Sequence, residues 1–163
     1  MRQLTPWLLA VVGLAACSGT LARLGKVDRT IGRASYHDIM KEVPEVLSRH
    51  GYAIYDRNIN GGGALYLETG WQERAPFEDE AAAGITYART RFIVRAREAS
   101  AATYTLRLSA ENEVQVGPDA TARVSRRKGT PWGTMAATAM YEAYVRQIAS
   151  DIEMRVAAGL RTF

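Results

Sequence analysis

The chain has very little cysteine and histidine, and this scarcity limits the chemistry that it can support. Its 163 residues include one cysteine, Cys17, and two histidines, His37 and His50. One cysteine excludes an internal disulfide, so the fold must rest on packing alone. The histidines are thirteen residues apart, a spacing that does not bring them together as zinc ligands. We therefore expect no metal and no cofactor. Because no nucleophile–base set stands out, we also expect a protein that is not an enzyme.

A long hydrophobic run is also missing near the N-terminus, which argues against a membrane-spanning helix there. The apolar run that begins at Trp7 is about ten residues long, whereas a spanning helix needs about 20. Arg2 precedes this run, and the small residues Ala15 and Ala16 end it. A positive start, a short apolar run and small residues are typical of a secretory signal peptide, which we assign to residues 1–16.

The end of the apolar run, Leu14-Ala15-Ala16-Cys17, resembles the lipobox of bacterial lipoproteins. The resemblance implies that Cys17 becomes the first residue of the mature protein and carries acyl chains such as palmitate. A thiolate is a strong nucleophile, and two or three acyl chains hold a protein firmly on a bilayer. Ser18, and not aspartate, follows the cysteine. In a diderm host this implies a lipid-anchored protein of the outer membrane that faces the periplasm.

The remaining chain has the length of a single domain. Removal of residues 1–16 leaves 147 of the 163 residues, enough to bury a hydrophobic core. Residues 17–34 show no clear periodicity and contain Gly19, Gly25 and Gly32, which predicts the lipidated cysteine followed by a tether. Residues 35–163 are expected to form one periplasmic α+β domain.

Two helices are predicted at the ends of this domain. Ser35 is a good N-cap for the first helix, with Asp38 three residues later, and Gly51 ends the helix. Pro44 lies inside the pattern and is expected to kink or split the helix. The last helix is predicted over residues 134–158, with an apolar stripe at helical spacing.

Four strands are predicted between the helices, because apolar and polar residues alternate there. Leu65, Leu67, Thr69 and Trp71 are expected on one face of the second strand. The fourth is expected to reach Val116 past a bulge. The predicted ranges are 52–56, 64–72, 87–98 and 104–111. The order α-β-β-β-β-α predicts an α+β two-layer sandwich, with two helices on one face of a four-stranded antiparallel sheet.

Three short stretches of this region form a recognisable sequence pattern. The residues concerned are Val46-Leu47-Ser48-Arg49-His50-Gly51-Tyr52, Asp56-Arg57 and Glu68-Thr69-Gly70-Trp71. A helix that ends in glycine and an aromatic residue is followed by a strand that ends in Asp-Arg and by a strand that ends in an aromatic residue. This order is similar to BamC-type helix-grip domains of outer-membrane assembly lipoproteins. Two helices on a four-stranded sheet also resemble LptE-type lipoproteins. These resemblances imply an accessory role in assembly of the outer membrane.

Basic side chains gather on one face of the third predicted strand. Because the strand alternates, its arginines lie on the side opposite Phe92 and Val94, and Glu68 and Glu111 are expected as cross-strand partners. Two interpretations stay open: a solvated, charge-paired face, or a surface that recognises anions through the planar guanidinium fork. The candidate surface consists of Arg89, Arg91, Arg95, Arg97, Arg107, Arg126, Arg127 and Lys128.

An acidic run, Glu78-Asp79-Glu80, lies in a loop predicted over residues 73–84. Consecutive carboxylates point in different directions, and the spacing of a calcium-binding loop is missing. We interpret the run as a solvated loop.

These features predict a non-enzymatic envelope lipoprotein, which acts as a binding or scaffold module at the periplasmic face of the outer membrane. An envelope protein, lipopolysaccharide or peptidoglycan is the expected partner, and nucleic acid is not expected at this location. Two alternatives stay open. A lipid-anchored cell-wall hydrolase needs a pocket with two convergent carboxylates. An accessory that binds lipid or lipopolysaccharide needs an apolar cavity between helices and sheet.

Overall fold

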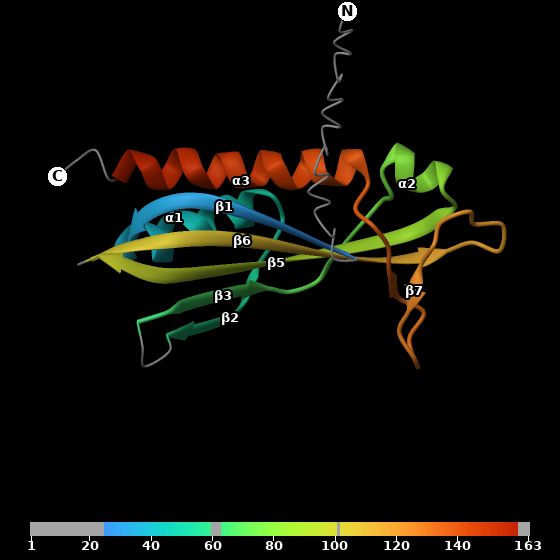
Figure 1. Ribbon diagram of the computed structural model, residues 1–163, viewed down its shortest axis with the longest axis horizontal. Helices are drawn as coiled ribbons and strands as arrows, with labels where there is room; N and C mark the ends of the chain where they lie inside the picture. The colour runs from blue at the N-terminus through green and yellow to red at the C-terminus, as the bar shows by residue number, and fades with distance from the viewer. Residues whose placement is uncertain (1–24, 60–62, 101, 160–163) are drawn as a thin grey trace, which may run out of the picture.

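The computed structural model describes residues 25–59, 63–100 and 102–159. The signal peptide predicted over residues 1–16 and the lipidation predicted at Cys17 lie outside the described residues. Three helices and eight strands make up the described chain (Figure 1). Their bounds are β1 Lys26–Ser35, α1 Tyr36–Arg49, β2 Ile54–Ile59, β3 Leu65–Thr69, β4 Gln72–Arg74, α2 Glu78–Ala82, β5 Ile85–Ser100, β6 Thr103–Val116, β7 Ser125–Arg126, β8 Gly133–Thr134 and α3 Ala139–Gly159.

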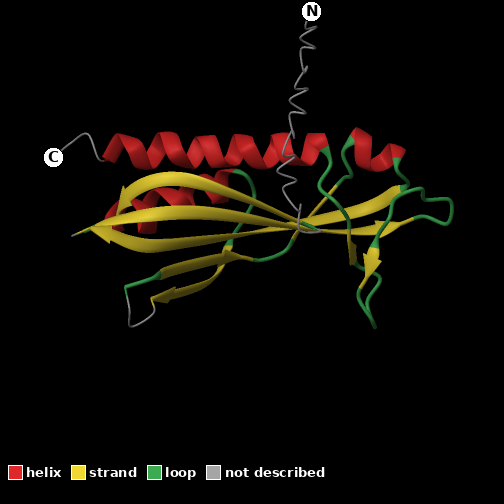
Figure 2. Ribbon diagram, viewed as in Figure 1, coloured by secondary structure: helices red, strands yellow, loops and turns green. Residues whose placement is uncertain are grey.

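The strands form one antiparallel sheet, and the helices lie on one side of it (Figures 1 and 2). The strand order is β2-β3-β5-β6-β8-β7, with β1 paired to β6 and β4 paired to β5. The predicted α+β class with an antiparallel sheet is confirmed. The prediction of four strands and two helices was wrong, because the described chain has eight strands and three helices. None of the described helices lies on the opposite side of the sheet (Figure 2), and we call this side the open face.

The hairpin of β5 and β6 forms the centre of the sheet and follows the predicted alternation. On β5, Ala88, Thr90, Phe92, Val94 and Ala96 are all buried on the helix side. The register runs without interruption from Ala88↔Val114 to Arg97↔Thr105. The bulge predicted in β6 near its end is therefore absent from this stretch of the hairpin.

Helix α1 begins as predicted and is not split. Ser35 is its N-cap, and the Ser35 hydroxyl accepts a hydrogen bond of 3.1 Å from the amide of Asp38. Gly51 follows the C-cap with φ +86°, the left-handed conformation that glycine adopts without strain. Of the two outcomes expected at Pro44, a kink or a split, the split was wrong, because α1 runs as one helix from Tyr36 to Arg49. The stripe that includes Val43 and Leu47 is fully buried on either side of Pro44, and this packing holds the helix together.

The first strand, β1, occupies residues 26–34 of the segment 17–34 that was predicted as the lipidated cysteine and tether. Residues Lys26–Ser35 pair with β6, and Val27, Ile31 and Ala34 are buried. The tether prediction was wrong here because the buried residues are spaced by four and three positions instead of two. A bulge between Thr30 and Gly32 causes this spacing, and Gly32 has φ +137°. The structured domain therefore begins before residue 35.

Trp71 lies on the opposite face from the one predicted. Leu65, Leu67 and Thr69 are buried on the helix side, as expected. From Glu68 to Gln72 the chain advances four residues while the partner strand β5 advances three, from Ile93 to Thr90. The extra residue at this point reverses the alternation. Trp71 therefore lies beside Arg89 and Arg91 on the open face.

The acidic run forms α2, and one of its carboxylates is the centre of a buried network. Glu80 is 0 % exposed, so the prediction of a solvated loop was wrong for this residue. Arg74 donates two hydrogen bonds of 2.7 Å to the Glu80 carboxylate. The Asn112 amide donates at 3.0 Å and the Phe77 backbone amide at 2.9 Å. Four donors thus compensate the buried charge and hold α2 against the sheet.

Helix α3 begins five residues later than predicted. Gly133 and Thr134 form β8 instead of the first helical turn. The Thr138 hydroxyl accepts a hydrogen bond of 3.3 Å from the Tyr141 amide, and Asp79 of α2 accepts one of 2.9 Å from the Met140 amide. These acceptors satisfy amides at the helix start. The predicted stripe is confirmed, with five residues at most 1 % exposed: Tyr141, Val145, Ile148, Ile152 and Val156.

Replacement of Glu80 by glutamine tests the buried network. Glu80→Gln keeps the shape of the side chain but leaves the Arg74 charge without its counter-ion, so we expect the free energy of unfolding to fall by about 3–5 kcal/mol. Urea denaturation at unchanged m value measures the change. Glu78→Gln, an exposed position in the same helix, serves as the control and should stay within about 0.5 kcal/mol of the parent protein. Equal stability of the two variants would contradict this role for Glu80.

Candidate functional site

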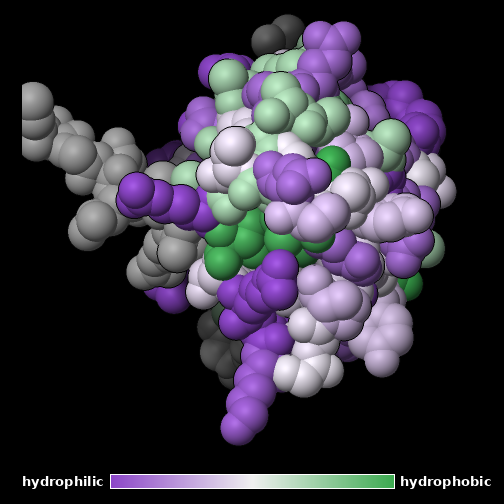
Figure 3. Space-filling model, turned by 90° about the vertical axis from the view of Figure 1, so that its right-hand side faces the viewer, coloured by the Kyte–Doolittle hydropathy of each residue, from purple (hydrophilic) through white to green (hydrophobic). Residues whose placement is uncertain are grey.

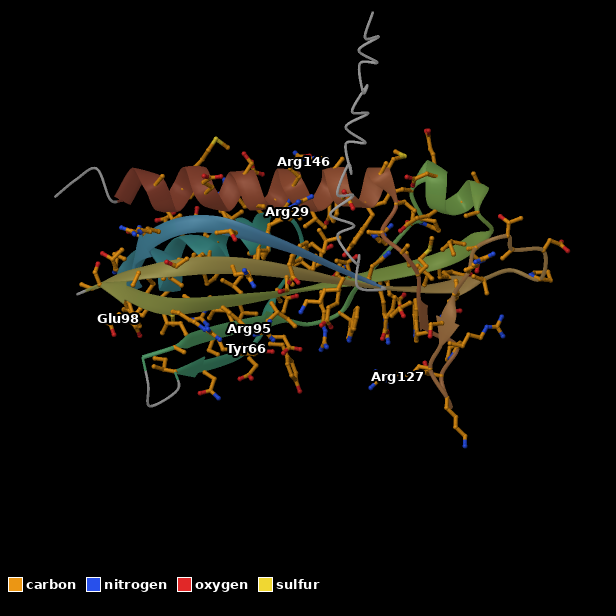
Figure 4. The ribbon with its side chains drawn as sticks, in the orientation of Figure 1. Arg29, Tyr66, Arg95, Glu98, Arg127 and Arg146 are labelled. Atoms are coloured by element: carbon orange, nitrogen blue, oxygen red, sulfur yellow. The ribbon has the colours of Figure 1, made fainter. Side chains whose placement is uncertain are left out.

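The open face carries most of the basic residues singled out in the sequence. Figure 4 shows Arg95 and Tyr66 on the side of the sheet away from α3, whereas Arg146 lies on α3 itself. Alternation along β5 places Arg89, Arg91, Arg95 and Arg97 on this face. These arginines fall into two groups, which differ in how their charges are balanced.

At one end of the open face the arginines are paired with glutamates. Arg89 lies 2.5 Å from Glu113. Arg91 lies 2.5 Å from Glu68 and 2.7 Å from Glu111. The predicted partners Glu68 and Glu111 are therefore confirmed for Arg91, and Glu113 was missed. We call this group the paired end.

The paired end is also stacked against tryptophan. The Arg89 guanidinium lies 4.2 Å from the ring centre of Trp132 and 4.7 Å from that of Trp71. Arg91 lies over Trp71 at 4.7 Å as well. Cation–π contacts and ion pairs fix these two guanidinium groups in place. Burial alone lowers the pKa of Arg91, but the hydrogen bond and charge of Glu111 and the charge of Glu68 outweigh it and raise the pKa.

At the other end the basic side chains surround a hollow. Its volume is about 480 Å³, and it is open to solvent. We call it the cationic hollow, and it is lined by Lys26, Asp28, Arg95, Arg97, Thr105, Arg107 and Ser109. From the sequence, Lys26 is a basic residue of the predicted tether and not a member of the candidate surface. Lys26 belongs to β1, and the bulge in β1 hides the alternation by which the sequence would have predicted that strand.

Arg95 and Arg107 lie directly opposite each other on β5 and β6. Side chains at such positions have Cβ atoms about 5 Å apart, and like charges there destabilise a sheet. Among the described residues, no carboxylate lies within 4.0 Å of the guanidinium nitrogens of Arg95, Arg97 or Arg107. Residues outside the described ranges contain no aspartate or glutamate. None of these three arginines therefore has a side-chain carboxylate as an ion-pair partner.

Asp28 is the acidic residue of the hollow, and other groups already engage it. Its carboxylate lies 3.6 Å from the Lys26 ammonium group and accepts a hydrogen bond from the Ser109 hydroxyl. Tyr66 borders Arg95, whose guanidinium lies 5.4 Å from the ring centre. Burial, and next the hydrogen bond that Tyr66 donates to Glu68, raise the pKa of Tyr66 to about 12. Tyr66 is therefore neutral at physiological pH and offers no counter-charge to Arg95.

The remaining basic candidates lie on a hairpin at the other end of the molecule. Arg126, Arg127 and Lys128 are exposed at or beside β7. Arg127 lies 3.9 Å from Glu113, so the hairpin borders the paired end and not the hollow. Figure 3 views this end and shows a hydrophilic tip below an area of hydrophobic side chains. The structure therefore distributes the eight predicted basic residues over three groups.

Other candidate chemistry is sparse in the described part of the chain. No group of three or more metal-ligating side chains occurs among these residues. His50 contacts Asp151 at 2.9 Å and links α1 to α3 on the helix side. Within the same ranges, no helix combines the length and apolarity needed to cross a bilayer.

Comparisons with known proteins do not assign the chain to a family. No family model matches the sequence, and no curated protein matches it. The geometry and charge of the open face therefore carry the functional argument.

Reversal of one charge tests whether Arg95 and Arg107 repel each other. Arg107→Glu places a carboxylate opposite Arg95, so we expect the free energy of unfolding to rise by about 0.2–1 kcal/mol. Chemical denaturation measures the rise. Arg146→Glu makes the same change in net charge on α3 and corrects for the general effect of charge. If Arg107→Glu is no more stable than this control, the repulsion is absent.

Proposed function

We propose that the protein is a lipid-anchored, non-enzymatic binding module whose open face recognises an anionic ligand of the cell envelope. The observation that carries this proposal is the opposed pair Arg95 and Arg107, together with Arg97, around one hollow. Within the described ranges, none of these three guanidinium groups has a carboxylate within 4.0 Å. A repulsive arrangement of this kind weakens the free protein, and a bound anion removes the repulsion.

The chemistry of the hollow favours phosphate or carboxylate groups. Guanidinium groups bind both through two parallel hydrogen bonds, and lysine adds a point charge. Arg95, Arg97 and Arg107 are exposed, so their donors are free to reach a ligand. The hydroxyl of Thr105, which also lines the hollow, supplies a neutral donor. A ligand that bears two or more anionic groups satisfies this set better than a single ion.

The lipid anchor at Cys17 is the second part of the proposal. It rests on the resemblance of residues 14–17 to a lipobox and on the short apolar run before them. Because β1 begins at Lys26, only eight residues separate Cys17 from the sheet. Even a fully extended segment of this length spans at most about 30 Å. An acylated Cys17 thus holds the domain close to the membrane surface.

Binding of inorganic tripolyphosphate tests the anion site directly. Arg107→Glu removes charge-assisted hydrogen bonds worth about 1.5–3 kcal/mol, so we expect the dissociation constant to rise about tenfold or more. Isothermal titration calorimetry at low ionic strength measures both proteins. Arg146→Glu is the matched control and should bind like the parent. Unchanged affinity of Arg107→Glu, or an equal loss in the control, would refute a site at the hollow.

Replacement of the cysteine tests the anchor. Cys17→Ala removes the acylated sulfur, so we expect the protein to move from the membrane fraction to the soluble fraction of cells. Ser18→Ala, at the neighbouring position, should leave the protein in the membrane fraction. Immunoblots of both fractions measure the distribution. Membrane attachment of Cys17→Ala that survives a carbonate wash would exclude the lipid anchor.

A further inference from the structure

We infer that the open face docks on the anionic phospholipid headgroups of the same bilayer that holds the anchor. This inference rests on the proposed function and names the ligand of its anion site. Three observations carry it: the division of charge between the two sides of the domain, the spread of cations over one face, and the position at which the chain enters the sheet.

The helix side and the open face differ in charge. Apart from Glu80, whose buried charge Arg74 neutralises, the three helices together contain eight acidic and four basic residues, a net charge of −4. The helices lie on one side of the sheet (Figure 2), and the unpaired arginines lie on the other. An anionic surface therefore attracts the open face and repels the helix side.

The cations of the open face cover a broad area, and this distribution favours an extended surface over a small ligand. One group surrounds the cationic hollow, and the second is the exposed tip at Arg126, Arg127 and Lys128. In Figure 4, Arg127 lies on the side of the sheet away from α3, as Arg95 does. The hollow is open to solvent. A sheet of headgroups reaches both groups of cations at once.

The tether enters the domain at the edge of the cationic hollow. Lys26, the first residue of β1, lines the hollow. Gly25 before it bonds to Met135 through its amide and to Asn112 through its carbonyl, so the strand is held in place from its first residue. With Cys17 eight residues away, the anchored bilayer lies within reach of the hollow. The anchor supplies proximity, and the charges select the face that turns toward the membrane.

The natural tryptophans report this orientation. After residue 16 the chain contains two tryptophans, Trp71 and Trp132, and both contact Arg89 on the open face. The lipidated full-length protein is reconstituted into vesicles of phosphatidylcholine, with or without phosphatidylglycerol. A trace of dansyl-phosphatidylethanolamine in both accepts energy from tryptophan. We expect greater transfer in the vesicles that contain phosphatidylglycerol, and loss of this gain at high salt.

Charge variants make the test specific. The gain in transfer should be lost in Arg107→Glu and reduced in the milder Arg97→Gln, and it should persist in Arg146→Glu. Circular dichroism verifies that each variant is folded. Equal transfer in both kinds of vesicle overturns the docking inference. If tripolyphosphate still binds in that case, the anion site stands with a ligand other than the bilayer. If tripolyphosphate fails to bind as well, the proposed function falls with it.

Discussion

The unbroken pairing of β5 with β6 determines both the core and the charged surface. From Ala88 to Arg97 each residue of β5 faces one fixed partner on β6. A shift by one residue would turn the arginines toward α1 and α3, where Phe92 and Leu106 are now buried. Burial on the helix side therefore locks the register, and the same register places Arg95 opposite Arg107. The core thus holds these two like charges together against their repulsion.

The two ends of the open face differ in how the charges of their arginines are balanced. At the paired end, glutamates neutralise the charges of Arg89 and Arg91, and tryptophan rings hold the two guanidinium groups in place. Around the hollow, Arg95 and Arg107 stay exposed without such partners in the described structure. Residues that bind ligands often weaken the free protein, because selection acts on function once stability is sufficient. The contrast within one strand distinguishes charges that stabilise the fold from charges available for binding.

The sequence predicts the regular parts of this molecule and misses features that depend on single insertions or distant partners. Three predictions are confirmed because each depends on a local sequence pattern: the alternation of β5, the cap at Ser35 and the stripe of α3. The prediction of a tether in place of β1 and the predicted face of Trp71 were wrong. In each segment one extra residue shifts the alternation of the strand. Burial of Glu80 depends on Arg74 and Asn112, which only the tertiary fold brings to it. The candidate surface was predicted by residue, but its division into paired and unpaired groups was not.

A double-mutant cycle on Arg95 and Arg107 is the most direct test of this account. Arg95→Gln, Arg107→Gln and the double variant give the coupling energy between the two side chains from denaturation curves. We predict that the coupling is unfavourable in the free protein, because the charges repel. It should become favourable with saturating tripolyphosphate, because the anion binds both side chains. A coupling energy near zero in both conditions, or one that the anion leaves unchanged, would contradict a shared anion site at this pair.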